Sequence, residues 1–429
     1  MEHNEIFEAA QRPDLEWSNL DLSHEKKWSQ QMGMVTPIFC EEVIPGDRWF
    51  IQSEIQVRLA PLVFSLEHRV NGYMHYFFTP NRVIWDDWND FIGGGDEGTV
   101  QNPTMPMMDG NVKSDWYIGR VGDYLGIPTI DSADTLNTNY DFIQELPFRA
   151  YQYTISEYFR DQNLQTTKFD PNAANDDTVL TEIAYRNWEH DYFTSCLPEA
   201  VRGGDTLLST SENITYKAAS TTGMLTGGSS SAVGLKKSAG AVQSYLTDDS
   251  NNAMTIENVS SVGVTVSVNE LRLAIRTQEF WETALRAGSR YNEVIKGHFG
   301  VHFEDLAYRP DYIGGFQFPI QITPVIQNSE TGTTPQGTIT GYGIGVTDDD
   351  NTVQFNATEW GWVQGLFSVL PRTAYMQGVP KKYTRDDRFD YYWPEFAHIG
   401  EQAVLNRELY FDPTTSGDAP TGTFGYQMR

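Results

Sequence analysis

The chain has 429 residues and a formal net charge of −28, from 58 acidic and 30 basic side chains. So acidic a chain excludes nonspecific binding to nucleic acid by its whole surface, because neutralising phosphates needs clustered Lys and Arg, and any such contact must be local. The 39% hydrophobic and 13% aromatic content is enough for a packed core. The sequence contains no run of 18 apolar residues, so no membrane span is predicted. Two cysteines are too few for a disulfide framework, which favours a reducing cytosolic setting.

The first 35 residues have the pattern of a polar, extended arm. Charged residues run through this stretch, which argues against a secretory signal. Two isolated aromatic residues, Trp17 and Trp28, need another surface against which to become ordered. That surface is either the chain's own core or a neighbouring subunit, and the sequence leaves both open. A β pattern then begins at Val35 and continues to Leu66.

Two strands and a short helix are predicted between Phe50 and Gly95. The strand segments are FIQSEIQVRLAP and NGYMHYFFTPNR, and a proline punctuates the end of each. In the following VIWDDWNDFIGGG, Trp85, Trp88 and Phe91 or Ile92 recur at helical spacing. This region is therefore a β-scaffold element, with no reactive group placed at its centre.

Residues 93–140 are loop-like, because Gly and Pro interrupt them repeatedly. Loops of this length usually form interfaces or carry function. A helix is predicted for residues 146–163. Its apolar face indicates core packing rather than a cofactor site, and consists of Tyr151, Ile155, Tyr158 and Phe159.

Residues 203–262 differ sharply in composition from the rest of the chain. Tyr216 and Tyr245 are their only aromatic residues, and Gly, Ser, Thr, Ala and Asn dominate, with GGSSSAVG near the middle. Such a segment buries little apolar area of its own, so it is either flexible or ordered by contact with copies of itself.

The clearest predicted helix follows this segment. Ser267 and Glu270 form a capping-box pattern, and Gly288 ends the helix. An apolar stripe runs along it, and a second short helix is expected around Tyr291, Val294 and Ile295. The stripe consists of Leu271, Ala274, Ile275, Trp281 and Leu285. Strands separated by turns return between Gly314 and Leu370, which favours a sandwich or barrel.

Several of these segments together resemble the major capsid proteins of the microviruses, small tailless bacteriophages with single-stranded DNA genomes, and in particular the gokushovirus-like branch. The matching segments follow the family's order over nearly the whole chain, and this order is more specific than any single motif. They are LDLSHEKKW, IFCEEVIPGDRW, HRVNGYMHYFFTPNRVIWDDWNDFI, LPFRAYQYTISEYFRDQN, NELRLAIRTQEFWETALRAGSRYNEVIKGHFGV, RPDYIGG and YYWPEFAHIGEQAVLNRELY.

This resemblance implies a mainly β fold, an eight-stranded jelly roll with long loop insertions and a few short helices. The expected organisation is an N-terminal arm at residues 1–35, a single jelly-roll domain at 36–429, and a C-terminal arm at 412–429. Residues 204–262 are expected to be a surface insertion that meets its symmetry mates as a threefold protrusion. The residues expected to mark this protrusion are Gly204, Tyr216, Gly228, Ser230 and Tyr245.

The resemblance also implies partners and a location. We expect sixty copies of the chain to form an icosahedral shell around a circular single-stranded DNA genome, with the insertion contributing to host recognition. A small basic DNA-binding protein, a DNA pilot protein and an internal scaffolding protein are expected to act with it, and a host receptor to be bound. Assembly is expected in the cytoplasm of a bacterial host, without insertion into a membrane. No enzymatic activity or cofactor is implied.

Catalytic and metal-binding motifs are mostly absent from the sequence. Phosphate-loop, nucleophile-elbow, HExxH and CxxC patterns are absent from the sequence. His298 and His302 are four residues apart, but Gly297 and Gly300 interrupt their helix, so metal binding is disfavoured. Two acidic groups are interpreted as exposed charges rather than as cation or glycosidase sites: Asp348, Asp349 and Asp350, and Asp86, Asp87 and Asp90.

The best local candidate for nucleic-acid contact is KKYTRDDRFDYYW, residues 381–393, which we call the basic segment. Cations interleaved with stacking rings are what a single strand needs. Three aspartates in the same segment cancel much of this charge, so a subunit interface or a solvated surface remains an alternative. The residues expected to touch single-stranded DNA are Lys381, Lys382, Tyr383, Arg385, Arg388 and Tyr391.

Two other classes of function remain as alternatives. A carbohydrate-binding or carbohydrate-active β-protein would explain acids beside aromatic residues, but the absence of a signal-peptide pattern weighs against it. A host-cell binding module would be a monomer or small oligomer. A self-assembling shell protein is favoured because it explains the arms, the long loops and the low-complexity insertion together.

Overall fold

The computed structural model describes most of the chain, and the statements below concern these residues only. They are residues 18–62, 66–93, 103–110, 112–133, 140, 142–167, 169, 177–200, 235–237, 244–246, 268–288, 291–300, 308–326, 339–347, 352–396, 400–413 and 422–428. The chain divides into two compact units. One contains residues Met1–Pro198 and Phe303–Arg429, and the other Glu199–His302. Each is described by itself.

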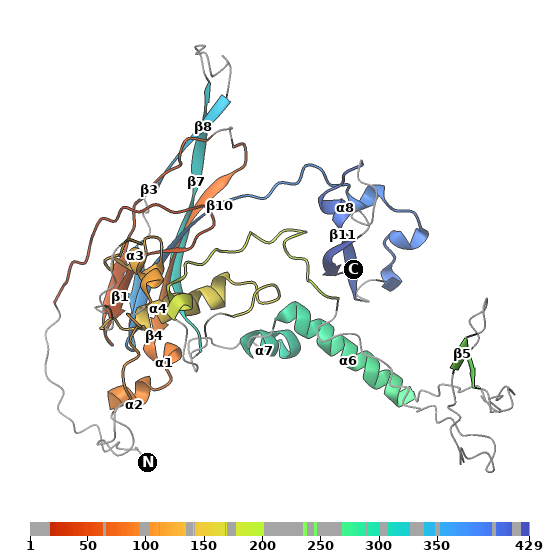
Figure 1. Cartoon of the computed structure of the whole chain (residues 1–429), viewed down its shortest axis with the longest axis horizontal. Helices are drawn as coiled ribbons and strands as arrows, with labels where there is room; N and C mark the ends of the chain where they lie inside the picture. The colour runs from red at the N-terminus through yellow and green to blue at the C-terminus, as the bar shows by residue number, and fades with distance from the viewer. Residues whose placement is uncertain are drawn as a thin grey trace. The chain divides into compact units, whose positions relative to one another are not determined.

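A six-stranded antiparallel sheet is the centre of the first unit. Its strand order is β1-β10-β4-β7-β8-β3, so neighbours in the sheet are distant in sequence. The first half of β7 pairs with β4 and its second half pairs with β8, so that β7 and β8 extend beyond the rest of the sheet (Figure 1). The strands are β1 (Thr36–Val43), β3 (Ile55–Arg58), β4 (Val70–Pro80), β7 (Asp311–Ile326), β8 (Ile339–Thr347) and β10 (Gly361–Pro371).

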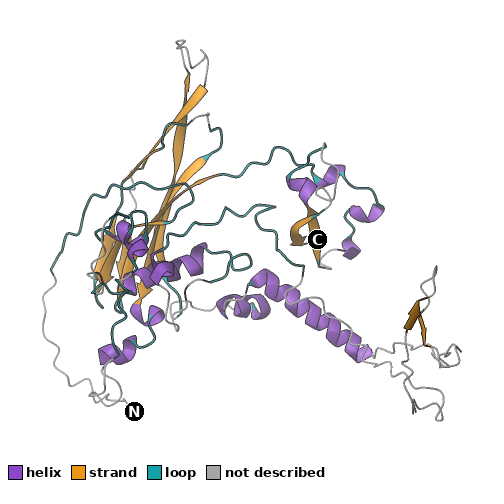
Figure 2. Cartoon of the chain, viewed as in Figure 1, coloured by secondary structure: helices purple, strands orange, loops and turns teal. Residues whose placement is uncertain are grey.

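The central strands β4 and β10 are buried almost throughout, and their alternating side chains supply two apolar clusters. Phe77, Trp362 and Leu366 belong to one cluster, which lies on the sheet face covered by short helices. Figure 2 shows these helices grouped beside one end of the sheet. They are α1 (Asn81–Ile84), α2 (Trp88–Gly93), η2 (Lys113–Trp116), α3 (Val121–Leu125), α4 (Leu146–Thr154), η3 (Ile155–Phe159) and α5 (Asp177–Thr181).

The opposite face of the sheet is covered by a two-stranded ribbon. Its strands, β2 (Arg48–Ile51) and β9 (Val353–Asn356), pair antiparallel. Ile51 joins Met74, Tyr76 and Phe367 in the second apolar cluster. In β10, a Cβ atom at Gly365 would lie 2.3 Å from the Phe39 ring, so only glycine lets the strands and this ring pack so closely.

The predicted helix at 146–163 forms, but it changes type before it ends. Helix α4 continues as the π-helical turn η3 and stops at Phe159. Tyr151 and Phe159 of the predicted apolar face are buried as expected. The π-helical turn adds a residue per turn, which places Tyr158 and Phe159 together at the edge of the helical layer.

The last part of the chain forms a smaller group of elements within the first unit. Strand β11 (Glu401–Leu405) pairs with β12 (Thr423–Met428), and Leu197 makes a further antiparallel bridge to Tyr426. Asp191 joins the stretch before Leu197 to the stretch that follows β10, because its carboxylate accepts hydrogen bonds from Thr373 and Tyr375, both 2.8 Å long. The remaining elements here are η5 (Lys381–Tyr383), η6 (Arg388–Asp390), η7 (Pro394–Phe396) and α8 (Asn406–Leu409).

The second unit contains the predicted helix pair. Helix α6 (Val268–Ala287) ends as expected at Gly288, whose φ of 102° is left-handed, and α7 (Tyr291–Phe299) follows. The stripe expected to be buried is partly exposed in the single chain: Leu285 is 4% exposed, but Ile275 is 50% exposed. Strands β5 (Leu235–Lys237) and β6 (Ser244–Leu246) pair antiparallel.

The segment before β1 lies on its own chain. Lys26 donates to the carbonyls of Pro37 and Ile38 at 3.2 and 2.9 Å, and to that of Tyr124. The Trp28 ring meets Phe367 edge-on, with ring centroids 5.8 Å apart. The chain's own core is therefore a partner of Trp28, while Trp17 lies outside the described residues.

The prediction of a mainly β fold with a few short helices is confirmed. Six strands form the main sheet of the described residues, and β2 and β9 cover it, which is consistent with a jelly roll. The count of eight strands stays a prediction. Cys40 and Cys196 are both free thiols, and burial raises the pKa of Cys40 to about 12.

Candidate functional site

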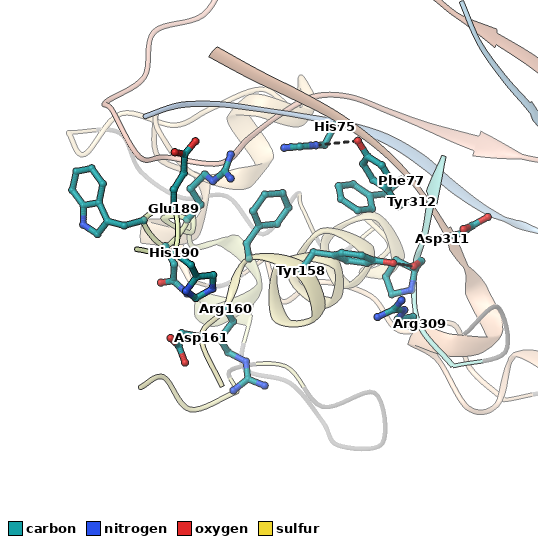
Figure 3. A pocket seen from close by; sticks show the side chains of 15 residues that line it. His75, Phe77, Tyr158, Arg160, Asp161, Glu189, His190, Arg309, Asp311 and Tyr312 are labelled. Carbon is teal, nitrogen blue, oxygen red and sulfur yellow. Dashed lines mark hydrogen bonds between the residues drawn. The ribbon is translucent and has the colours of Figure 1, made fainter. Parts of the chain in front are cut away.

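A cavity of about 720 Å³ lies beside β4 on the face that carries the helices (Figure 3). We call it the β4 pocket. Its lining combines seven rings with three arginines and three carboxylates, drawn from four separate stretches of the chain. These residues are His75, Phe77, Tyr158, Phe159, Trp188, His190 and Tyr312, Arg160, Arg186 and Arg309, and Asp161, Glu189 and Asp311, with Asn187 and Pro310 between them.

The rings form a continuous wall. Alternation along β4 points His75 and Phe77 to the same side, and antiparallel pairing sets Tyr312 of β7 opposite Phe77. The Phe77 ring centroid lies 4.8 Å from that of Tyr158 and 5.3 Å from that of Tyr312. Figure 3 shows His75, Phe77 and Tyr312 gathered on one side, with Glu189 and His190 on the other.

Two of these rings are fixed by hydrogen bonds. The Tyr158 hydroxyl donates to the carbonyl of Pro310 at 2.6 Å, which ties the end of the helical layer to the start of β7. The Tyr312 hydroxyl lies 3.4 Å from Nδ1 of His75. Tyr312 is nevertheless 46% exposed, so one side of its ring is open to a ligand.

Arg186 is held in place by rings and a hydroxyl, with the charge of Glu189 nearby. Its guanidinium lies 4.4 Å from the centroid of the Tyr73 ring and 5.7 Å from that of Phe159, and donates to the Ser368 hydroxyl at 3.2 Å. Its backbone N–H donates to the carbonyl of Gly33 at 2.8 Å. Among the ion pairs of the described residues, none involves Arg186. Burial lowers its pKa, and the guanidinium stays charged at neutral pH.

The carboxylates of the pocket have donors or a cation of their own. Glu189 accepts the Tyr73 hydroxyl, and Asp161 accepts the backbone N–H of Asn163 at 2.9 Å. Burial raises the pKa of Asp311, and the charge of Arg309 opposes that shift. Three arginines and three carboxylates cancel formally, so the pocket is neutral within a chain of net charge −28.

His75 adds a ring to the pocket rather than a charge. Burial, with a smaller effect from the charge of Arg186, lowers its pKa from 6.5 to about 4. The imidazole is therefore neutral at physiological pH. It lies parallel to the Tyr73 ring, with an interplanar angle of 13° and centroids 6.3 Å apart.

The basic segment has a different geometry. Each of three cations lies over a ring of the same segment: Lys382 is 4.8 Å from the Tyr383 centroid, Arg385 is 4.9 Å from that of Tyr391, and Arg388 is 4.8 Å from that of Phe389. Lys381 donates to Oε1 of Gln402 at 2.8 Å. All six residues predicted to touch DNA lie in this segment, and their contact with DNA stays a prediction.

The aspartates of the basic segment shape its backbone. Asp387 accepts the N–H of Arg388 at 2.6 Å and caps η6. Asp390 accepts the N–H groups of Asp386 and Asp387 at 2.9 and 3.1 Å, and these bonds lower its pKa. The Asp390 carboxylate therefore stays negative beside the cations, which weakens the attraction of the segment for phosphate.

Most residues predicted for the threefold protrusion lie outside the described residues. These are Gly204, Tyr216, Gly228 and Ser230. Tyr245 is in β6, opposite Lys236 of β5. The role of the insertion at 204–262 therefore stays a prediction.

The acidic and histidine groups considered for metal or catalysis are placed only in part. Asp86, Asp87 and Asp90 are exposed at the start of α2. His298 stacks on Phe280, with centroids 4.5 Å apart, whereas His302 and residues 348–350 lie outside the described residues. No group of three metal-ligating side chains occurs in the part of the chain that the structure describes, and no helix there is long and apolar enough to span a bilayer.

Sequence reasoning missed the β4 pocket. Its residues come from β4, η3, residues 186–190 and residues 309–312, and they meet only when the sheet and helices form. The available signal was weak: RNWEH at 186–190 and YRPDY at 308–312 each mix a cation with rings, and the second overlaps RPDYIGG, which was interpreted only as a family motif.

Comparison with known proteins gives one consistent family. A family model described as "Capsid protein (F protein)" matches residues 10–429. The chain is 33% identical to capsid protein VP1 of Chlamydia phage 1, over 96% of this chain and 81% of the relative. It is 31% identical to capsid protein VP1 of Bdellovibrio phage phiMH2K, over 92% and 76%, and 28% identical to that of Spiroplasma virus 4, over 96% and 79%.

Proposed function

Because the chain belongs to the phage capsid protein (F protein) family, we propose that sixty copies of it form an icosahedral shell around a single-stranded DNA genome. The family match over residues 10–429 carries this proposal. The protein is a structural, non-enzymatic component of the virion. The number of sixty copies per shell, the circular form of the DNA and a role in host recognition are parts of this proposal.

An uncovered face of the sheet supports self-assembly. Beyond the helical layer, alternate residues of β8 are exposed, and the glycines between them face the covered side. The exposed fractions are 36% for Tyr342, 40% for Ile344 and 66% for Val346, with Val325 of the neighbouring β7 at 50%. Neighbouring apolar side chains exposed in this way indicate a protein interface.

The partners named by resemblance are part of the same proposal. A chain of net charge −28 is poorly suited to neutralise a genome alone, so we expect a small basic DNA-binding protein inside the shell. A DNA pilot protein and an internal scaffolding protein are expected during assembly in the bacterial cytoplasm. The insertion at 204–262 is proposed to form the threefold protrusion and to meet the host receptor.

Negative-stain microscopy of the protein purified from expressing cells tests the shell. We expect uniform hollow particles from the wild type. Val346→Asp places a charge on the uncovered face and should leave folded subunits that do not assemble. The matched control is Ile118→Asp, the same kind of change at an exposed aliphatic residue outside the sheet, between η2 and α3, and it should change assembly less. Monomers alone, even with the scaffolding protein co-expressed, would refute the proposal.

Charge predicts how assembly responds to salt. Subunits of net charge −28 repel one another, and salt screens this repulsion. Assembly yield should therefore rise with ionic strength or with divalent cations. Equal yields across a salt series and after addition of a chelator would contradict this expectation.

A further inference from the structure

The β4 pocket has the chemistry of a binding site. Its volume of about 720 Å³ lies within the range of small-ligand pockets, and its polar groups converge on one cavity lined by rings. Arg186 supplies a half-buried cation that forms no ion pair among those of the described residues, with the charge of Glu189 nearby. A half-buried cation of this kind is stabilised by an anionic ligand.

The two ends of the pocket differ in character. Arg186 lies beside Phe159, and the Phe159 ring is 5.8 Å from that of His75. Tyr158 and Tyr312 stand at the other end of the same wall, on either side of Phe77. A ligand that fits both ends carries an anion close to a flat ring.

We propose that the β4 pocket receives one nucleotide of a single-stranded nucleic acid, with its base on the wall formed by Tyr158 and Tyr312 and its phosphate at Arg186. This inference rests on the proposed function and names where the genome meets the subunit. A single strand is required, because a base stacked inside a duplex cannot enter a pocket. Stacking on rings tolerates every base, as packaging a whole genome needs.

A basic peptide is the other ligand that the carboxylates invite, and the geometry favours it less. Glu189 and Asp161 already accept hydrogen bonds from Tyr73 and from the backbone of Asn163. Asp311 is balanced by Arg309. The guanidinium of Arg186 lies near the charge of Glu189 but forms no ion pair among those of the described residues, and it repels a cationic side chain at its end of the pocket.

Photo-crosslinking maps the contact directly. Purified shells are incubated with an oligothymidylate that contains 5-iodouracil, irradiated, digested and analysed by mass spectrometry. We expect crosslinks at Tyr158, Trp188 or Tyr312. Shells that form normally but crosslink only within the basic segment, or not at all, would overturn the inference and leave the proposed function standing. Failure to form shells would count against the proposed function, and the same experiment on subunits would still test the pocket.

Fluorescence anisotropy with a labelled oligothymidylate tests the role of Arg186. Arg186→Gln should weaken binding roughly tenfold or more, and Arg186→Lys should restore part of the loss, because it keeps the charge without the planar guanidinium. The matched control is Arg58→Gln, an exposed arginine of β3 outside the pocket, which makes the same change in net charge. Equal effects of the two Gln variants would refute a specific site.

A second variant keeps the test decisive if Arg186→Gln does not fold. Trp188 lines the pocket and is 49% exposed, so Trp188→Leu should leave the melting temperature unchanged and weaken oligonucleotide binding about threefold to tenfold. Unchanged binding in a folded Trp188→Leu protein would contradict the proposal. The proposal would also be contradicted if an oligoarginine peptide quenched tryptophan fluorescence in the wild type but not in Trp188→Leu, while the oligonucleotide quenched neither.

Discussion

The β4 pocket and the basic segment contain the same types of side chain and arrange them in opposite ways. In the basic segment, cations and rings are neighbours in sequence, and Arg385 lies over the Tyr391 ring of its own segment. In the β4 pocket, Arg186, Tyr158 and Tyr312 come from stretches far apart in sequence and surround a cavity. Both regions place cations over rings. In the basic segment these pairs lie within one contiguous stretch, whereas in the pocket Arg186 lies near Phe159 and Arg309 lies over Tyr158 around a cavity.

This difference shows that composition finds cations and rings but not a site. The basic segment was found from its sequence because its residues are contiguous, yet Asp387 and Asp390 fix its backbone, and Asp390 keeps its charge beside the cations. The β4 pocket is invisible in the sequence because pairing of β4 with β7 creates it. The strength of oligonucleotide binding should therefore depend on the folded structure at the β4 pocket. At the basic segment it should depend on net charge alone.

The largest expected effect follows from removing a ring shared by the pocket and the core. Phe77 is 2% exposed, so Phe77→Ala should lower the free energy of unfolding by about 3–5 kcal/mol. Phe389→Ala in the basic segment removes a ring that is 44% exposed and should cost less than about 1 kcal/mol. Denaturant unfolding of isolated subunits measures both. Similar losses would show that the two regions do not differ in their dependence on packing.

The fold was predictable where local pattern and burial agree. The strand at residues 71–82, the helix ending at Gly288 and the mainly β class all follow from alternation, capping and composition. The order β1-β10-β4-β7-β8-β3 does not follow, because strand order depends on contacts between residues hundreds of positions apart. The same limit applies to the pocket, since no local pattern brings Arg186 beside Phe159.

A second prediction concerns the pH response of the pocket. Burial and the charge of Arg186 lower the pKa of His75 from 6.5 to about 4. A depressed histidine pKa means that the unfolded chain binds the proton first, so His75 stabilises the fold fully above pH 6.5 and loses this contribution as the pH falls toward 4. Because each pKa unit corresponds to about 1.36 kcal/mol, the pKa difference of His75 between the folded and unfolded chain is equivalent to about 3 kcal/mol of unfolding free energy.

Unfolding measured between pH 7 and pH 4 tests this prediction. His75→Phe should flatten the loss of stability over that range. Tyr312→Phe removes the hydroxyl that lies 3.4 Å from the imidazole but keeps the histidine, so it should retain the slope of the wild type. An unchanged slope in His75→Phe would assign the acid sensitivity to carboxylates elsewhere.

A smaller effect is expected at Asp191, which follows the pocket residue His190 and accepts hydrogen bonds from Thr373 and Tyr375. Burial alone would raise its pKa, but hydrogen bonds from Thr194, Thr373 and Tyr375 outweigh it and lower the pKa to about 2. Asp191→Asn should cost about 1–3 kcal/mol, because it weakens several charge-assisted bonds at once. Stability supplied by the carboxylate is present above pH 3.8 and is lost as the pH falls toward 2.

The control for Asp191 is Asp386→Asn, an exposed carboxylate of the basic segment, which should change unfolding by less than about 0.5 kcal/mol. The same Asp191 variant should also weaken oligonucleotide binding, because Asp191 anchors the stretch that carries Trp188 into the pocket. Normal binding despite lower stability would show that the pocket keeps its shape without this anchor.

The smallest effect is expected from the arginines of the basic segment. Arg385→Gln and Arg388→Gln should each weaken oligothymidylate binding less than about threefold, because these cations lie over their own rings with aspartates beside them. A cation that contacts a phosphate contributes about 0.7 to the slope of log affinity against log salt for a single strand. The double variant of Arg385 and Arg388 should therefore change this slope by much less than the value for two phosphate contacts, whereas Arg186→Gln should change it by about the value for one. If the double variant instead changed this slope by the amount expected for two phosphate contacts, the nucleic-acid site would lie in the basic segment, because only phosphate neutralisation produces a salt dependence of that size.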